Sequence, residues 1–190
     1  MSENRLQEVL EGRRLVSEAD IISVVSTTAL HSLLGQGEGY WKDAEHTSVS
    51  PQTILAAGTG VLSIDGLHAN TSLTQLNSLP ATTWSSNKIN PEVSGESYDM
   101  RIDLTVERSS SVTGQYVQLQ IDIGSGSEVI ILERRIDLFK QAGEPQRTSI
   151  GVPIFCRDTF FANGGRILLK PSENVGIYGK AIFLRRNYRP

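Results

Sequence analysis

The sequence has few features that mark a specialised class of protein. A single cysteine, Cys156, among 190 residues excludes an intrachain disulfide framework and a cysteine-based zinc site. No apolar run reaches the roughly 18 residues that a membrane-spanning helix needs, so we expect no membrane segment. The formal net charge is only −3, which argues against a broad nucleic-acid-binding face. The composition is that of an ordinary globular protein, and the chain is long enough to bury a core without disulfides or a structural metal ion.

Motifs of catalysis are missing as well. None of the histidines, His31, His46 and His68, has a partner at a metal-ligand spacing. There is neither a G-x-S-x-G nucleophile elbow nor a phosphate-binding loop that ends in Lys-Ser or Lys-Thr. Cys156 has no histidine near it in sequence, so we expect a buried thiol rather than a nucleophile. We therefore predict a protein that is not an enzyme and needs neither a cofactor nor a metal ion.

A period of two dominates the second half of the chain. Between residues 98 and 107 every second side chain is apolar, which places all of the apolar ones on one face of a strand. Residues 115–123 repeat the pattern after a short polar linker. Further short apolar segments follow up to residue 186, and no helical segment connects them as parallel strands would require. This pattern predicts an all-β fold, an antiparallel β-sandwich of the jelly-roll type.

Local signals add four predictions within this sandwich. Residues 53–57 and 61–64 flank a Gly-Thr-Gly segment and are expected to form a hairpin. Pro153 indicates an edge strand or a bulge, because proline cannot donate to a sheet ladder. A change of character after Leu132 favours a β-bulge in that strand. Asn163, Gly164 and Gly165 predict a tight turn, since these residues tolerate positive φ.

Residues 1–40 differ from the rest and are expected to form a short helical or extended arm, with residues 41–190 as the sandwich domain. The arm has apolar residues at helical spacing followed by two arginines, but its apolar stripe is too narrow to fold alone. We expect it to order on a partner. The candidate attachment residues are Leu6, Val9, Leu10, Arg13 and Arg14. Glycines 35, 37 and 39 predict a flexible joint between the two parts.

Two predicted strands carry rows of polar side chains. Asp99 and Asp103 share one strand face about 13 Å apart, which is too far for a glycosidase pair, and Arg101 lies between them. Gln118 and Gln120 form a second row. Such rows are either solvated or face another subunit. The candidate subunit-interface residues are therefore Asp99, Arg101, Asp103, Gln118 and Gln120.

Two tryptophans and three C-terminal arginines lie outside these rows, and the tryptophans have two interpretations. Trp41 and Trp84 lie in loop-like contexts, where an exposed indole would stack on a sugar ring. The alternative is an indole that is packed over the end of the sandwich or in a subunit contact. Arg185, Arg186 and Arg189 form a small basic patch that we expect to be a solvated tail.

Two stretches, together about a third of the chain, resemble structural proteins of tailed bacteriophages. Residues 82–106 have a tryptophan, an Asn-Lys-Ile-x-Pro segment and a Gly-x-x-Tyr-x-x-Arg strand. Residues 148–186 have Pro-x-Phe, Asp-Thr-Phe, Ala-Asn-Gly-Gly and Val-x-Ile-Tyr elements. The residues that carry the first resemblance are Trp84, Asn87, Lys88, Ile89, Pro91, Gly95, Tyr98 and Arg101.

The resemblance implies a jelly-roll domain that is similar in shape to tumour-necrosis-factor domains, assembles as a homotrimer and is carried on a virion after assembly in the host cytoplasm. It implies no catalytic residues. We expect a capsid cement or decoration protein whose partners are its own copies and the major capsid protein or another virion protein. In this hypothesis the arm attaches the trimer to the shell. The alternative is a head- or tail-fibre module that binds a host receptor or glycan.

Overall fold

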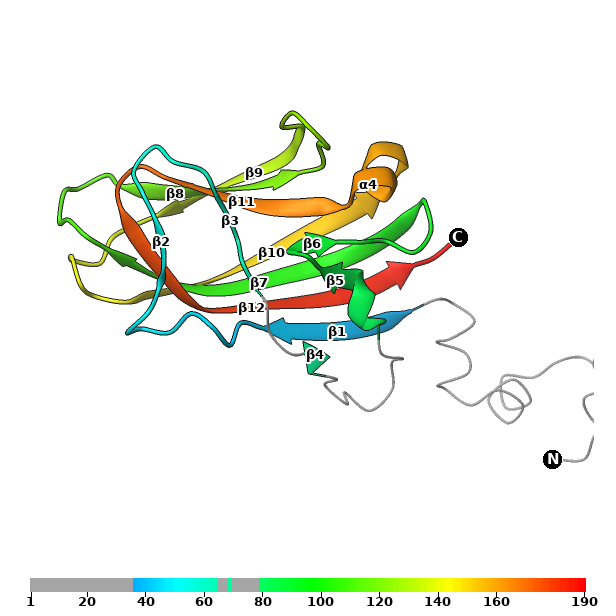
Figure 1. The fold of residues 1–190 in the computed structure, drawn as a ribbon, viewed down its shortest axis with the longest axis horizontal. Coiled ribbons are helices and arrows are strands. Elements are labelled where there is room, and N and C mark those ends of the chain that lie inside the picture. The colour runs from blue at the N-terminus through cyan, green and yellow to red at the C-terminus, as the bar shows by residue number, and fades with distance from the viewer. Residues whose placement is uncertain (1–35, 65–67, 70–78) are drawn as a thin grey trace, which may run out of the picture.

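The computed structural model of the protein describes residues 36–64, 68–69 and 79–190. These residues form two antiparallel β-sheets that pack face to face (Figure 1). The candidate attachment residues of the arm, Leu6 to Arg14, and His31 lie outside the described residues.

The first sheet has the strand order β10-β7-β12-β1-β4, and β2 also pairs with β12. Its strands are β1 (Gly37–Lys42), β2 (Gln52–Ile54), β4 (His68–Ala69), β7 (Glu96–Arg108), β10 (Gln146–Cys156) and β12 (Val175–Tyr188).

The second sheet has the order β5-β6-β11-β8-β9, and β3 also pairs with β11. Its strands are β3 (Gly60–Val61), β5 (Trp84–Ser85), β6 (Lys88–Ile89), β8 (Tyr116–Asp122), β9 (Ile130–Asp137) and β11 (Gly165–Pro171). Two short helices, η1 (Ala81–Thr83) and α4 (Asp158–Asn163), lie in the connections.

The strand order is that of a jelly roll. Along the chain, the principal strands β1, β6, β7, β8, β9, β10, β11 and β12 pass from one sheet to the other at every connection except β8–β9. The resulting four-stranded orders, β1-β12-β7-β10 and β6-β11-β8-β9, are those of two Greek keys folded into a double sheet. The predicted fold class is therefore confirmed.

The core lies between the two sheets, where the period-two residues meet. On β7 the inward side chains, from Tyr98 to Val106, are at most 2% exposed. They face a similar row on β8, where Val117, Leu119 and Ile121 are fully buried. Truncating a buried aliphatic side chain of this kind costs about 2–5 kcal/mol, so these two rows contribute much of the stability of the sandwich.

The predicted hairpin between residues 53–57 and 61–64 is wrong. β2 pairs with β12 and β3 pairs with β11, so the segment crosses from one sheet to the other. Instead of backbone hydrogen bonds between β2 and β3, the Gln52 side chain connects the two segments. Its amide nitrogen donates to the Val61 carbonyl at 2.6 Å, and its amide oxygen accepts from the Ser63 N–H at 3.3 Å.

The part of the glycine-rich segment that the structure describes, from residue 36 to residue 39, leads into a strand and is not a flexible joint. Gly37 and Gly39 belong to β1, which pairs with β12 along its whole length. Gly39 is needed there because the Trp41 indole lies over it. A Cβ added at position 39 would come within 2.3 Å of Trp41 Cη2.

The remaining local predictions hold in part. Pro153 lies in β10, which is an edge strand as predicted. The bulge in β9 occurs at Ile131, before the expected position. Gly164 has a φ of 72°, but it ends the helix α4 rather than closing a hairpin turn. This helix was not predicted, and the buried Phe160 ring anchors it against the Gly165 backbone.

Candidate functional site

The solvent-facing side of the first sheet carries a group of aromatic and charged side chains. We call this side, formed by β10, β7, β12 and β1, the outer face. Because successive side chains in a strand point to opposite sides, the core residues of these strands fix which residues face outward. Phe155 is 50% exposed there, and three further aromatic residues are half-buried. These aromatic residues are Tyr40, Phe155, Tyr178 and Phe183.

The predicted charge row lies on this outer face. Arg101 Nε lies 3.1 Å from Asp103 Oδ2, and the Ser149 hydroxyl donates to Asp103 Oδ1 at 2.6 Å. The guanidinium of Arg101 also lies 5.5 Å from the centre of the Phe183 ring. Charges and aromatic rings therefore alternate across neighbouring strands, which is the mixture of Arg and aromatic side chains that is enriched in protein interfaces.

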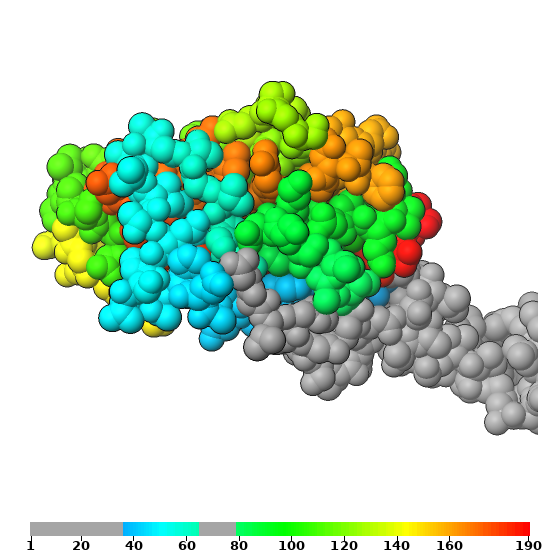
Figure 2. Space-filling model, viewed as in Figure 1, coloured from blue at the N-terminus to red at the C-terminus, as the bar shows by residue number. Residues whose placement is uncertain are grey.

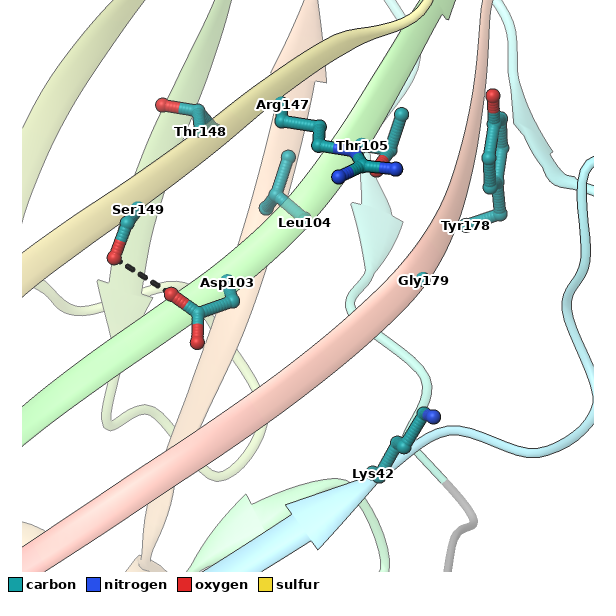
Figure 3. Close-up of a pocket in the computed structure, with 9 residues that line it drawn as sticks. All are labelled: Lys42, Asp103, Leu104, Thr105, Arg147, Thr148, Ser149, Tyr178 and Gly179. Carbon is teal, nitrogen blue, oxygen red and sulfur yellow. Dashed lines mark hydrogen bonds between the residues drawn. The ribbon is translucent and has the colours of Figure 1, made fainter.

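The outer face is hollowed where β12 bulges. Gly179 has a φ of 58° and no side chain, and a cavity of about 570 Å³ opens beside it. Figure 3 shows Lys42, Arg147 and Tyr178 around this hollow. Burial, and then the nearby Glu107 carboxylate, raise the pKa of Tyr178, so the phenol stays protonated and can donate a hydrogen bond.

Gln118 and Gln120 are not part of the same surface. They lie on β8, on the outward side of the second sheet. Gln120 is only 6% exposed, and its amide donates to Glu133 at 2.8 Å. The five predicted interface residues are thus divided between opposite faces of the sandwich, with only Asp99, Arg101 and Asp103 on the outer face.

Both tryptophans are buried, which removes them as sugar-stacking residues. Trp41 is 2% exposed and Trp84 is 4% exposed. The Trp84 indole N–H donates to the Ile64 carbonyl at 3.2 Å. The packed alternative is therefore the correct one, because neither indole presents a ring face to solvent.

The C-terminal arginines differ: the Arg185 side chain is 52% exposed, as expected of a solvated tail, whereas Arg186 and Arg189 form ion pairs. Arg186 is 7% exposed, and its guanidinium lies 3.0 Å from the buried Glu96 and 2.6 Å from Glu92. Arg189 lies 3.2 Å from Glu92. Tyr98 completes this cluster by donating its hydroxyl to Glu96 at 2.6 Å. No local sequence pattern predicts this cluster, since the acidic partners are about ninety residues away along the chain.

A second buried charged cluster was also missed. The Lys180 ammonium lies 3.2 Å from Asp43 Oδ2, 2.7 Å from Gln52 Oε1 and 3.1 Å from His46 Nδ1. The side chains of Lys180 and Asp43 are both fully buried. This cluster joins β12 to the segment that follows β1, and it uses residues that are more than 120 positions apart.

The described residues offer little for catalysis or metal binding. Among them there is no group of three His, Cys, Asp or Glu side chains that could hold a metal ion. Burial, and to a lesser degree Glu96, raise the pKa of the Cys156 thiol to about 12, so it is not a thiolate near neutral pH. In the part of the chain that the structure describes, no helix is long and apolar enough to cross a membrane.

Comparison with known proteins gave structural likenesses only. No family model and no curated protein matches the sequence. Among solved structures, Eiger TNF from S. frugiperda has 10% identity and a TM-score of 0.46, over 82% of this chain and 94% of that one. The protein of particles derived from infectious bursal virus has 10% identity and a TM-score of 0.44, over 79% and 31% of the two chains.

The PRD1 vertex protein P5 has 14% identity and a TM-score of 0.43, over 81% of this chain and 74% of that one. Of the bursal virus protein, this chain spans less than a third of the length. These values are too low to transfer a function, and the jelly-roll assignment rests on the strand order itself.

Proposed function

We propose that this protein is a structural component of a tailed-phage virion, a homotrimeric cement or decoration protein that binds the capsid through its N-terminal arm. In this role the trimer adds buried area across the joints between capsid subunits. The shell then resists internal pressure because more contacts must break before the joints open.

The observation that carries the proposal is the placement of the two stretches that resemble phage structural proteins. They are far apart in sequence but lie beside each other in both sheets, because β7 pairs with β10 and β12 and β6 pairs with β11. Lys88 pairs with Arg166 and Ile89 pairs with Gly165 across β6 and β11. A Cβ at Gly164 would come within 2.8 Å of the Ile89 carbonyl. The resembling residues therefore support each other as one structural unit, which is what a shared architecture predicts.

The outer face supports the homotrimer. A cyclic trimer is built from heterologous contacts, in which one surface of each subunit meets a different surface of the next. The outer face supplies aromatic rings and arginines, and the charges of Arg101 and Asp103 already neutralise each other within the chain. Such a surface is buried at a lower desolvation cost than a row of unpaired charges.

The arm is tested by changing its apolar stripe in the full-length protein. Replacing Leu6, Val9 and Leu10 with aspartate should abolish co-sedimentation with capsids that lack the protein, while the trimer stays folded. Deletion of residues 1–34 should have the same result. A matched control replaces Ser2, Asn4 and Gln7 with aspartate and should keep capsid binding. Undiminished binding by the deletion variant would refute the attachment role.

A further inference from the structure

One end of the sandwich combines rigid loops with exposed apolar side chains. We call it the loop end. It contains the β7–β8 loop (109–115), the β9–β10 loop (138–145) and the β11–β12 loop (172–174). The C-terminus and the start of β1 lie at the opposite end (Figure 1), and Figure 2 shows the green and yellow loop segments side by side.

Phe139 is the most prominent side chain of this end. It is 75% exposed, which is more than any other aromatic residue that the structure describes. The ring stands beside a hollow of about 530 Å³ between the first two loops. Hydroxyl and amide side chains complete the lining, among them Thr113, Ser111 and Gln141. A flat apolar ring beside several hydrogen-bonding groups is the lining of a small-ligand site.

The hollow is held in shape by a buried arginine. The Arg108 guanidinium donates to the carbonyls of Leu138 and Lys140, at 3.1 and 3.0 Å, and to that of Val112 in the facing loop. Its Nε lies 2.7 Å from the buried Glu173. Because one side chain fixes the backbone of both loops, a ligand meets a site that is already formed and pays little ordering entropy.

The two loops are also joined directly. The Ala142 N–H donates to the Ser111 hydroxyl at 3.0 Å, and the Gly143 N–H donates to the Arg108 carbonyl at 3.1 Å. These bonds explain why a loop pair with several serines and glycines keeps a defined hollow between its two halves.

The lining indicates an uncharged ligand. Glu173 neutralises Arg108, so Lys140 is the remaining cation of the lining. One cation is too little for a phosphate-rich ligand such as a nucleic acid. A stable protein partner would need roughly 800 Å² of surface on each side, far more than the hollow provides. A sugar ring has an apolar face that can pack on Phe139 and hydroxyls that can pair with Thr113 and Gln141.

We propose that the hollow at the loop end is a binding site for a neutral saccharide, with Phe139 as the ring on which the sugar stacks. The site lies opposite the end where the chain enters β1, so a trimer attached by its arm would present it outward. It therefore extends the proposed virion role, but its geometry does not depend on that role.

The test is a glycan array of neutral and acidic oligosaccharides probed with the full-length protein, followed by titration calorimetry on the retained glycans. Phe139→Ala should weaken binding about tenfold, the factor that corresponds to one lost aromatic stacking contact. Thr113→Val should weaken it by a smaller factor, and Phe139→Tyr should restore most of it.

Phe161→Ala is the matched control, because Phe161 is 43% exposed but lies on α4, away from the loop end. It should bind glycans like the wild type. Failure of the folded protein to retain any neutral glycan, or equal binding by Phe139→Ala, would overturn the proposal. Capsid binding by Phe139→Ala is expected to be unchanged, so the saccharide site and the virion role succeed or fail separately.

Discussion

Lys180 and Asp43 are two oppositely charged side chains that are both removed from solvent and lie against each other. A buried ion pair of this kind contributes little compared with two well-packed apolar residues, because both groups lose their hydration. Removing only one partner is a different matter, since the other charge is then left buried without its counter-ion. The cluster therefore holds the segment after β1 against β12 only while it is complete.

We predict that Lys180→Met lowers the free energy of unfolding by about 3–5 kcal/mol, the usual cost of breaking a buried pair. Urea denaturation measures the change. The control is Lys170→Met, because Lys170 pairs with Glu128 at 2.8 Å in a solvent-exposed position. Exposed pairs contribute at most about 1 kcal/mol. Equal losses in the two variants would contradict the structural role of the buried cluster.

Asp122 shows how a titrating group can be tied to stability. Burial alone would raise its pKa, but the N–H groups of Val129 and Gly124 donate to the carboxylate at 2.8 and 2.9 Å, and Arg166 pairs with it. Together these donors outweigh burial, and the pKa of Asp122 lies below its usual 3.8. A carboxylate with a lowered folded-state pKa stabilises the fold above its unfolded pKa, and this stability is lost as the pH falls through the folded-state pKa.

Asp122→Asn should therefore destabilise the protein at neutral pH, and the difference from the wild type should shrink as the pH is lowered below 3.8. Urea unfolding at a series of pH values measures this difference. Asp137→Asn is the control, because the Asp137 side chain is 72% exposed and its loss should have little effect at any pH. A difference that stays constant across the series would show that the charge of Asp122 is not what stabilises the fold.

At the scale of elements, β1 shows how packing can override local preference. Glycine is poor in strands, and three glycines before residue 40 indicate a joint when only the sequence is considered. In the structure the Trp41 indole covers Gly39, so the absence of a side chain is a packing requirement. The same relation holds between Phe160 and Gly165, where a Cβ would come within 2.4 Å of the ring.

Gly39→Ala should destabilise the protein by about 1–3 kcal/mol, the usual cost of overpacking. The added methyl group would force the Trp41 indole from its site. Thermal unfolding and tryptophan fluorescence both report the change. Gly151→Ala in β10 is the control, since a Cβ there meets nothing within 4 Å and the stability should stay within about 0.5 kcal/mol. A neutral effect of Gly39→Ala would mean that the indole can move aside.

At the scale of the whole molecule, the two outward sides of the sandwich differ. Phe183 on the outer face and Tyr116 on the second sheet are both half-buried aromatic residues beside an arginine. The guanidinium carbon of Arg101 lies 5.5 Å from the centre of the Phe183 ring, and that of Arg135 lies 4.2 Å from the centre of the Tyr116 ring. Among the described residues, the outer face combines such a ring with further aromatic residues, Tyr40, Phe155 and Tyr178. The proposed trimer should therefore depend on Phe183 and not on Tyr116.

Phe183→Glu is expected to convert the trimer to monomers without loss of β-structure, because it places an unpaired charge in the proposed contact. Tyr116→Glu should remain trimeric. Light scattering coupled to gel filtration measures the mass, and circular dichroism checks the fold. The proposal that the outer face is the subunit contact is wrong if the Phe183 variant stays trimeric, or if both variants dissociate.

The fold class and most of the long strands could be predicted from the alternation of apolar and polar residues. An alternating row such as that of β7 has only one arrangement that buries its apolar side, and this constraint is local. Pro153 likewise indicated an edge strand or a bulge, because proline lacks the N–H that an interior strand must donate, and β10 is an edge strand.

The surfaces that are available for binding could not be predicted in this way, because they depend on contacts between distant segments. Trp41 in β1 and Trp84 in β5 are buried while Phe139, just after β9, is exposed, and neither outcome follows from residue type. Arg186, Lys180 and Arg108 are buried because their acidic partners arrive from distant strands. Burial of a charge depends on contacts that form only when the sheets close on each other, and these are not encoded in any short stretch of the chain.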